Sequence, residues 1–155
     1  MKPIEIKISG DIQKSPQEIC SAILDTNRWT EFTGYSILPG IESAHFETKT
    51  QGIVGSRISV KNKDGSSHIE EIIEWDAPHQ VAMKFQDFNG VVKNLASHFI
   101  ETWSFQPSDN GTRATRMMAF YPKGIWAWLV LFPISRLMKT AFEQDFLKQG
   151  GKLGT

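Results

Sequence analysis

Two charged side chains, Glu101 and Arg116, lie among aromatic and aliphatic residues in the segment ETWSFQPSDNGTRATRM, residues 101–117. Residues 108–111 (Ser-Asp-Asn-Gly) are of the types that end strands and form turns, so the segment predicts a β-hairpin. A loop of these four residues places Trp103 opposite Arg116. A three-residue loop would turn the same side chains to the other face.

Side chains alternate along a strand, so this pairing divides the hairpin into two faces. One face is mostly large and apolar but also holds the acid and the base: Phe99, Glu101, Trp103, Phe105, Ala114, Arg116, Met118 and Phe120. The opposite face, which includes Thr102 and Thr115, is smaller and more polar. Burying a lone charge is unfavourable, so on the apolar face Glu101 and Arg116 would each need a partner.

The acid and the base have two interpretations. In one, both lie at the rim of the sheet and reach water, with the Arg116 stem passing Trp103. In the other, they are the polar anchor of an apolar small-molecule pocket, where Arg116 meets a ligand carboxylate or hydroxyl and Glu101 orients it. The predicted ligand-binding residues are Phe85, Phe99, Glu101, Trp103, Phe105, Arg116, Met118 and Phe120, together with the inward side of the last helix.

The sequence has no pattern typical of a metal site, a cysteine nucleophile, a phosphate-binding loop or a serine esterase. The histidines His45, His68, His79 and His98 lie on different predicted elements without metal-ligand spacing, so no metal site is expected. Cys20 belongs to an apolar helical stripe and is interpreted as a core residue rather than a nucleophile. Neither a phosphate-binding loop nor a Gly-x-Ser-x-Gly elbow occurs. We therefore predict no catalytic residue and no cofactor.

The length and charge of the chain limit its class. Its 155 residues predict one domain, residues 1–155. The 17 basic and 17 acidic side chains cancel, which gives the chain as a whole no electrostatic basis for binding nucleic acid or an anionic membrane. One cysteine cannot form an internal disulfide, and the N-terminal segment has no signal-peptide core. We expect a cytoplasmic protein.

The N-terminal elements are predicted from alternation and capping. Residues 3–12 alternate isoleucine with charged residues, which is typical of a half-buried strand. Residues 15–18 (Ser-Pro-Gln-Glu) combine a capping serine, a proline at the first helical position and the glutamate of a capping box. A second short helix should contain Trp29 and Phe32 and end at Gly34.

Four further strands are predicted before the Glu101–Arg116 hairpin. They cover residues 41–49, 55–62, 68–75 and 80–85. Pairing Trp75 with Gln80 sets Ile72 opposite Met83. The core-facing residues of this hairpin are then Glu70, Ile72, Glu74, Val81, Met83 and Phe85.

A long helix is predicted over residues 124–149, and it is the only element large enough to cover one face of the sheet. The expected fold is α+β: a curved antiparallel sheet gripping the long C-terminal helix, with two short helices after the first strand. The run at residues 125–134 is too short to span a membrane and contains Pro133, so no transmembrane segment is expected. This run is apolar nearly all round, so it should also contact a ligand, a partner subunit or a membrane.

Three segments carry a resemblance to a known superfamily. They are IEIKISGDIQKSPQEICSAILDTNRWTEF, EEIIEWDAPHQVAMKF, and ETWSFQPSDNGTRATRM with the helix that follows. In this order the chain resembles the START-related (SRPBCC, helix-grip) superfamily of polyketide cyclases/dehydrases, lipid-transfer domains and pollen-allergen-like ligand carriers. The resemblance implies an apolar ligand held between sheet and long helix, and it carries over no catalytic residue.

Three functions follow from these patterns. The predicted function is binding or transport of a hydrophobic small molecule, such as a lipid, an isoprenoid or a polyketide-like compound. The first alternative is a polyketide cyclase/dehydratase-like enzyme with Glu101 as general base, although a neighbouring Arg116 opposes the raised pKa that such a base needs. The second alternative is an interaction module that uses Trp126, Trp128 and Phe132 to dock on a membrane, a membrane protein or a second copy of the chain.

Overall fold

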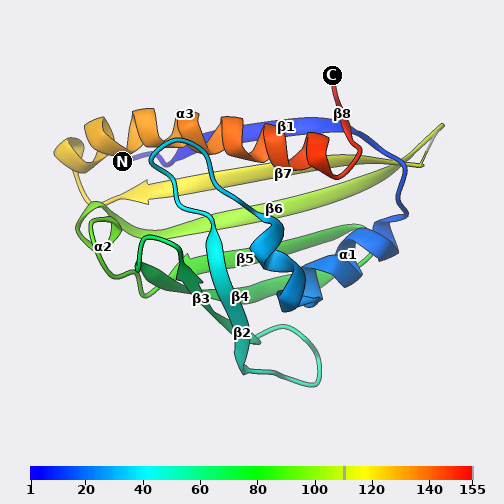
Figure 1. Ribbon diagram of the computed structural model, residues 1–155, viewed down its shortest axis with the longest axis horizontal. Helices are drawn as coiled ribbons and strands as arrows, with labels where there is room; N and C mark the ends of the chain where they lie inside the picture. The colour runs from blue at the N-terminus through cyan, green and yellow to red at the C-terminus, as the bar shows by residue number, and fades with distance from the viewer. Residues whose placement is uncertain (110, 155) are drawn as a thin grey trace.

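The computed structural model describes residues 1–109 and 111–154. Asn110 of the predicted hairpin loop lies outside the described residues. The described chain forms one eight-stranded antiparallel sheet, with a long C-terminal helix along it and shorter helices after the first strand (Figure 1). The predicted α+β helix-grip fold is confirmed.

The sheet order is β2-β3-β4-β5-β6-β7-β1-β8, so the first strand lies between β7 and the short last strand. The strands are β1 (Ile4–Ile12), β2 (Ile41–Thr48), β3 (Arg57–Asn62), β4 (Ser67–Asp76), β5 (Gln80–Gln86), β6 (Ala96–Ser108), β7 (Gly111–Pro122) and β8 (Lys152–Leu153). The helices are α1 (Pro16–Leu24), the 3₁₀ helix η1 (Thr26–Glu31), α2 (Val92–Leu95) and α3 (Ile125–Lys148). The two shortest elements, α2 and β8, were not predicted.

The connection from β1 to α1 follows the predicted capping box. The Ser15 hydroxyl accepts a hydrogen bond from the Glu18 N–H at 3.1 Å, and the Glu18 carboxylate accepts one from the Ser15 N–H at 2.7 Å. These two bonds satisfy backbone donors at the start of the helix, where no intrahelical partner exists. The helix then buries Ile19 and Cys20 on one side, which places α1 over the sheet.

The hairpin of β6 and β7 has the predicted register. Trp103 pairs with Arg116 as predicted, although the strands run into the predicted four-residue loop, because Ser108 and Gly111 also pair with each other. Glu101, two residues before Trp103, therefore shares the face of Arg116. On the opposite face the hydroxyls of Thr115 and Ser9 of β1 lie 2.9 Å apart.

The hairpin of β4 and β5 departs from the prediction by one residue. Ile72 pairs with Met83 as predicted, but the register then shifts, and Trp75 does not pair with Gln80. The shift is a β-bulge, which inserts one unpaired residue into β4. A one-residue shift exchanges the faces, so Trp75 packs on the core, whereas Glu74 accepts hydrogen bonds from the Gln80 side chain. The predicted core-facing position of Glu74 is wrong.

Different helices cover the two parts of the sheet. The α3 helix lies along β7 and β1 and buries Leu131, Phe142 and Phe146 (Figure 1). Residues of α1 and η1, including Ile23 and Trp29, pack on the core cluster of β3, β4 and β5. The space beneath these two covers is where the site residues meet.

Within the described residues, α3 is the one helix long and apolar enough to cross a membrane by length and composition. The apolar run at residues 125–134 is only the first part of α3, because the helix continues past Pro133 to Lys148. The side chains of Leu131, Phe142 and Phe146 on this helix are buried in the core.

Candidate functional site

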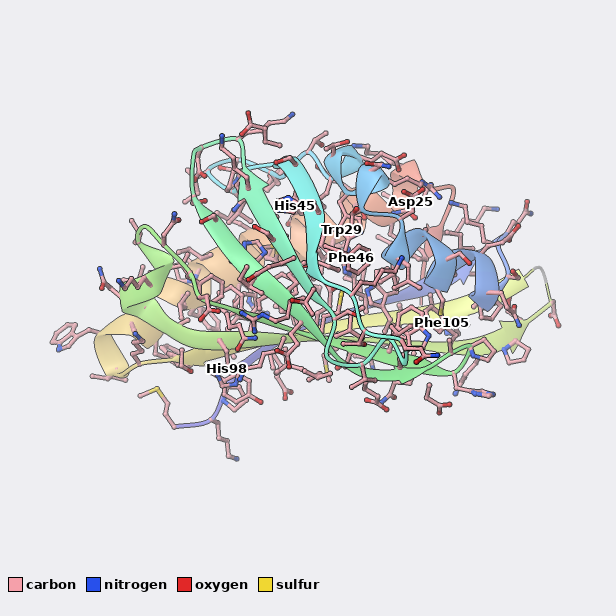
Figure 2. All side chains as sticks on the ribbon, turned by 90° about the horizontal axis from the view of Figure 1, so that it is seen from below. Asp25, Trp29, His45, Phe46, His98 and Phe105 are labelled. Carbon is pink, nitrogen blue, oxygen red and sulfur yellow. The ribbon has the colours of Figure 1, made fainter. Side chains whose placement is uncertain are left out.

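A pocket of about 850 Å³ lies on the sheet face that the helices cover. Its walls come from α1, η1, the strands β4 to β7, the segment around α2, and α3. Figure 2 shows Trp29 of η1 on this side of the sheet and His98 of β6 on the other side. Pockets that enclose small organic ligands have volumes of about 300–1,000 Å³, so the space is large enough for one.

The structure brings the predicted site residues together, with one exception. Those that line the pocket are Phe85, Phe99, Glu101, Trp103, Arg116, Met118 and Phe120. Phe105 does not line it. That side chain is buried and stacks on Trp103, with the ring centres 6.2 Å apart. It therefore packs beside the pocket wall, because it lies two residues farther along β6 toward the hairpin loop.

Glu101 and Arg116 form an ion pair in the pocket wall. The Arg116 Nε donates to Glu101 Oε2 at 2.8 Å, and Nη2 lies 2.8 Å from the same oxygen. The other carboxylate oxygen, Oε1, accepts a hydrogen bond from Trp103 Nε1 at 3.3 Å. The Glu101 side chain is only 2% exposed, so the pair is not at a solvated rim.

A third charged residue, Asp145 of α3, completes this group. Arg116 Nη1 donates to Asp145 Oδ2 at 3.5 Å. Asp145 was not among the predicted site residues, because the sequence of a helix gives no signal of which strand residue a given side chain will face. Two carboxylates and one guanidinium have a formal net charge of −1, so the positive charge of Arg116 is already matched by the protein.

A second polar pair, His68 and Glu70, lines the same pocket. His68 Nε2 lies 3.1 Å from Glu70 Oε1, and the side chains are 11% and 6% exposed. The His68 ring stacks on Phe85 with ring centres 5.2 Å apart. Burial raises the pKa of the Glu70 carboxyl, and the hydrogen bond from His68 opposes this shift.

The sequence contained a signal for this second pair. His68 and Glu70 are two residues apart on a predicted strand, so their side chains share one face. Glu70 was predicted to face the core, but neither residue was predicted as part of the site. The missing information was that this face borders a pocket.

Other candidate groups do not assemble into a site. Within the described residues, no group of three or more His, Cys, Asp and Glu side chains could hold a metal ion. Cys20 is buried as a free thiol, and burial raises its pKa. The side chains that line the pocket include carboxylates, guanidinium groups, an imidazole and aromatic rings.

Comparisons with solved structures give the same fold. TTHA0849 from Thermus thermophilus has a TM-score of 0.69 at 18% identity, covering 94% of this chain and 93% of that chain. MLL2253 from Mesorhizobium loti has a TM-score of 0.67 at 13% identity, with 94% and 93% covered. Ginseng major latex-like protein 151 from Panax ginseng has a TM-score of 0.61 at 13% identity, with 90% and 97% covered. At such identities the likeness shows the fold alone.

The family assignment comes from the sequence. No curated protein matches the chain significantly. Residues 3–149 match the family described as polyketide cyclase / dehydrase and lipid transport. This match spans nearly the whole chain, and it confirms the resemblance drawn from the three sequence segments. The chain belongs to the polyketide cyclase / dehydrase and lipid transport family.

Proposed function

We propose that the protein binds a hydrophobic small molecule in the pocket between the sheet and the helices. The observation that carries this proposal is the 850 Å³ pocket itself, with aromatic walls and a few buried polar groups. A mostly apolar cavity with converging polar groups is the usual form of a small-molecule site. The buried single cysteine fits a cytoplasmic carrier, a location that remains a prediction.

The charge of the Glu101–Arg116–Asp145 group favours a neutral ligand. From the sequence, Arg116 is expected to meet a ligand carboxylate or hydroxyl. Because Arg116 is already paired with Glu101 and Asp145, a ligand carboxylate would meet a group with excess negative charge. A hydroxyl or carbonyl oxygen can accept a remaining guanidinium N–H without adding charge. We therefore expect lipid-like, isoprenoid or polyketide-like molecules with neutral oxygens.

The test compares two ligands that differ in one group. Dodecanol and laurate should be titrated against the protein loaded with the neutral dye Nile red. We expect dodecanol to displace the dye at concentrations at least about tenfold lower than laurate, a difference of about 1.4 kcal/mol. Failure of Nile red and of both ligands to bind would overturn the proposed function, whereas preference for laurate would overturn only the neutral-ligand argument.

A matched pair of variants shows whether binding uses this pocket. Met138 of α3 lines the pocket, whereas Met117 of β7 does not. Met138→Trp should fill part of the space and weaken dye binding at least about tenfold, while Met117→Trp should leave it unchanged. Equal effects of the two substitutions would place the dye elsewhere.

A second candidate function is docking on an anionic lipid surface through the start of α3. Trp126 is 80% exposed, and Ile125, Leu129, Val130 and Phe132 are also exposed. Val91, exposed beside α2, lines the pocket, and α2 lies at the same end as the start of α3 (Figure 1). Such a contiguous apolar patch is typical of a contact surface.

Charge supports a lipid surface as the partner of this patch. Residues 111–142 contain no Asp or Glu. Lys123, just before α3, donates to the carbonyl of Lys93, which places both lysines near the patch. Co-sedimentation with phosphatidylglycerol vesicles should be strong, should weaken with salt, and should be lost in Trp126→Ser. A dimer that Trp126→Ser dissociates, without vesicle binding, would instead assign the patch to a second copy.

A further inference from the structure

The His68–Glu70 pair has a geometry that ligand binding alone does not require. Glu70 Oε1 lies 3.1 Å from His68 Nε2, and this is the one side-chain hydrogen bond of the Glu70 carboxylate among the described residues. Both residues line the pocket. A carboxylate oxygen that borders an apolar pocket and has no protein donor is available to a ligand.

Glu101, the residue considered first as a base, is arranged differently. Its Oε2 accepts from Arg116, and its Oε1 accepts from Trp103. Both oxygens are therefore engaged by N–H donors of the protein. Of the two buried glutamates of the pocket, only Glu70 has an oxygen free to accept a proton from a ligand.

We propose that Glu70, positioned by His68, exchanges a proton with a carbon acid bound in the pocket, so that the protein enolises a carbonyl-containing ligand. This proposal rests on the ligand binding proposed above. The burial that raises the pKa of Glu70 makes its carboxylate a stronger base than an exposed glutamate. His68 is a positioning residue, because its contact is with Glu70 Oε1.

The proton and the electron pairs of this step are all accounted for by the ligand and the Glu70 carboxylate. Glu70 takes a proton from the carbon next to the carbonyl, the C–H electron pair becomes a C=C bond, and the carbonyl π pair moves to the oxygen. Arg116 lines the same pocket, and a guanidinium N–H that is not used by Glu101 or Asp145 can donate a hydrogen bond to this oxygen. Return of the proton to the same carbon, or to the far carbon of an adjoining C=C bond, completes the cycle. The second route is an isomerisation, and neither route needs an oxidant or reductant.

The experiment measures proton exchange on a defined ketone. The protein is mixed with 2-tetralone in D₂O, and loss of the signal of the protons next to the carbonyl is followed by NMR. We expect exchange at least about tenfold faster than in matched buffer, with a rate that rises with pH and levels off as Glu70 becomes ionised. Glu70→Gln should reduce the rate to the buffer value. Glu74→Gln, which changes a glutamate of the same strand outside the pocket, should leave it unchanged.

His68 requires a separate readout. His68→Gln retains a hydrogen-bond donor but cannot carry the charge of an imidazolium, so it should shift the pH at which the rate levels off. Should Glu70→Gln fail to fold, Glu70→Asp, which keeps the carboxylate but withdraws it by one methylene, should lower the rate while retaining its pH dependence.

Binding of 2-tetralone is measured in parallel by displacement of Nile red. Displacement without faster exchange, or equal exchange by the parent and Glu70→Gln, would overturn the proton-transfer proposal and leave the proposed binding function intact. Absence of any binding by dye or ketone would overturn both.

Discussion

The guanidinium carbon of Arg116 lies 3.5 Å from the ring centre of Phe142, and the same group lies 4.8 Å from the ring of Trp103. A cation of β7 is thus held between an aromatic ring of α3 and one of β6. The Arg116 guanidinium therefore takes part both in cation–π contacts and in ion pairs with Glu101 and Asp145. This group ties the long helix to the sheet beside the pocket.

Removal of Arg116 should therefore be strongly destabilising. In Arg116→Ala, the buried Glu101 and the partly buried Asp145 would remain without a cation, and we expect the free energy of unfolding to fall by about 3–5 kcal/mol. A triple variant that adds Glu101→Gln and Asp145→Asn to Arg116→Ala should regain much of the lost free energy of unfolding. Urea unfolding measures both. A triple variant no more stable than Arg116→Ala would show that the loss comes from packing rather than from unpaired charge.

Arg57 provides the control for this change. It pairs with Glu71 and Asp87, but its side chain is 31% exposed. Exposed ion pairs are worth about 0–1 kcal/mol, so Arg57→Ala should have a correspondingly small effect. Equal losses in Arg57→Ala and Arg116→Ala would contradict the role assigned to burial.

Trp103 lines the pocket and is only partly buried, so its truncation should affect binding more than stability. We expect Trp103→Ala to cost about 1–3 kcal/mol, because the side chain has fewer protein contacts to lose, and to weaken Nile red binding at least about tenfold. Phe146 of α3 is buried and does not line the pocket. Phe146→Ala should cost about 3–5 kcal/mol. If Trp103→Ala costs as much and leaves binding intact, Trp103 is part of a solid core.

Glu70 should make the stability of the protein depend on pH. Its pKa is raised in the folded state, so the folded state binds more protons, and its contribution is fully present below the ordinary glutamate pKa of about 4.3. That contribution is lost as pH rises through the raised value, by about 1.4 kcal/mol for each unit of the shift. His68, Glu101, Arg116 and Asp145 also line this pocket and are unchanged in Glu70→Gln, so the comparison of the two proteins isolates Glu70.

The measurement is urea unfolding of the parent and Glu70→Gln from acidic to neutral pH. Relative to Glu70→Gln, the parent should lose stability as the pH rises. Parallel stability curves would show that burial of Glu70 has no net effect on its ionisation.

Cys20 should react slowly with thiol reagents in the folded protein. Its side chain is buried in α1, and burial raises its pKa, so little reactive thiolate is accessible. Ellman's reagent should modify the thiol rapidly only after unfolding in guanidinium. Rapid modification at native conditions would mean that α1 opens readily over the pocket.

Much of the fold could be predicted from local patterns. The capping box at Ser15 and the alternation of β1 are local, because each depends on residues within one turn or one strand. The register that puts Glu101 beside Arg116 also follows from a short loop and the alternation of two strands. The β-bulge after Ile72 was not predicted, because no residue type at that point of β4 marks the extra, unpaired residue.

The site depended more on tertiary structure. The amino-acid sequence by itself determined that an acid, a base and several aromatic rings share one face of a sheet. Only the packing of α3, α1 and η1 over that face decided that it borders a pocket, that Asp145 joins Arg116 across 29 residues of chain, and that His68 and Glu70 line the same space. The physical reason is that the charge of side chains and their alternation along a strand are set within one segment of the chain. A cavity, by contrast, is the volume that remains between several segments after they pack together.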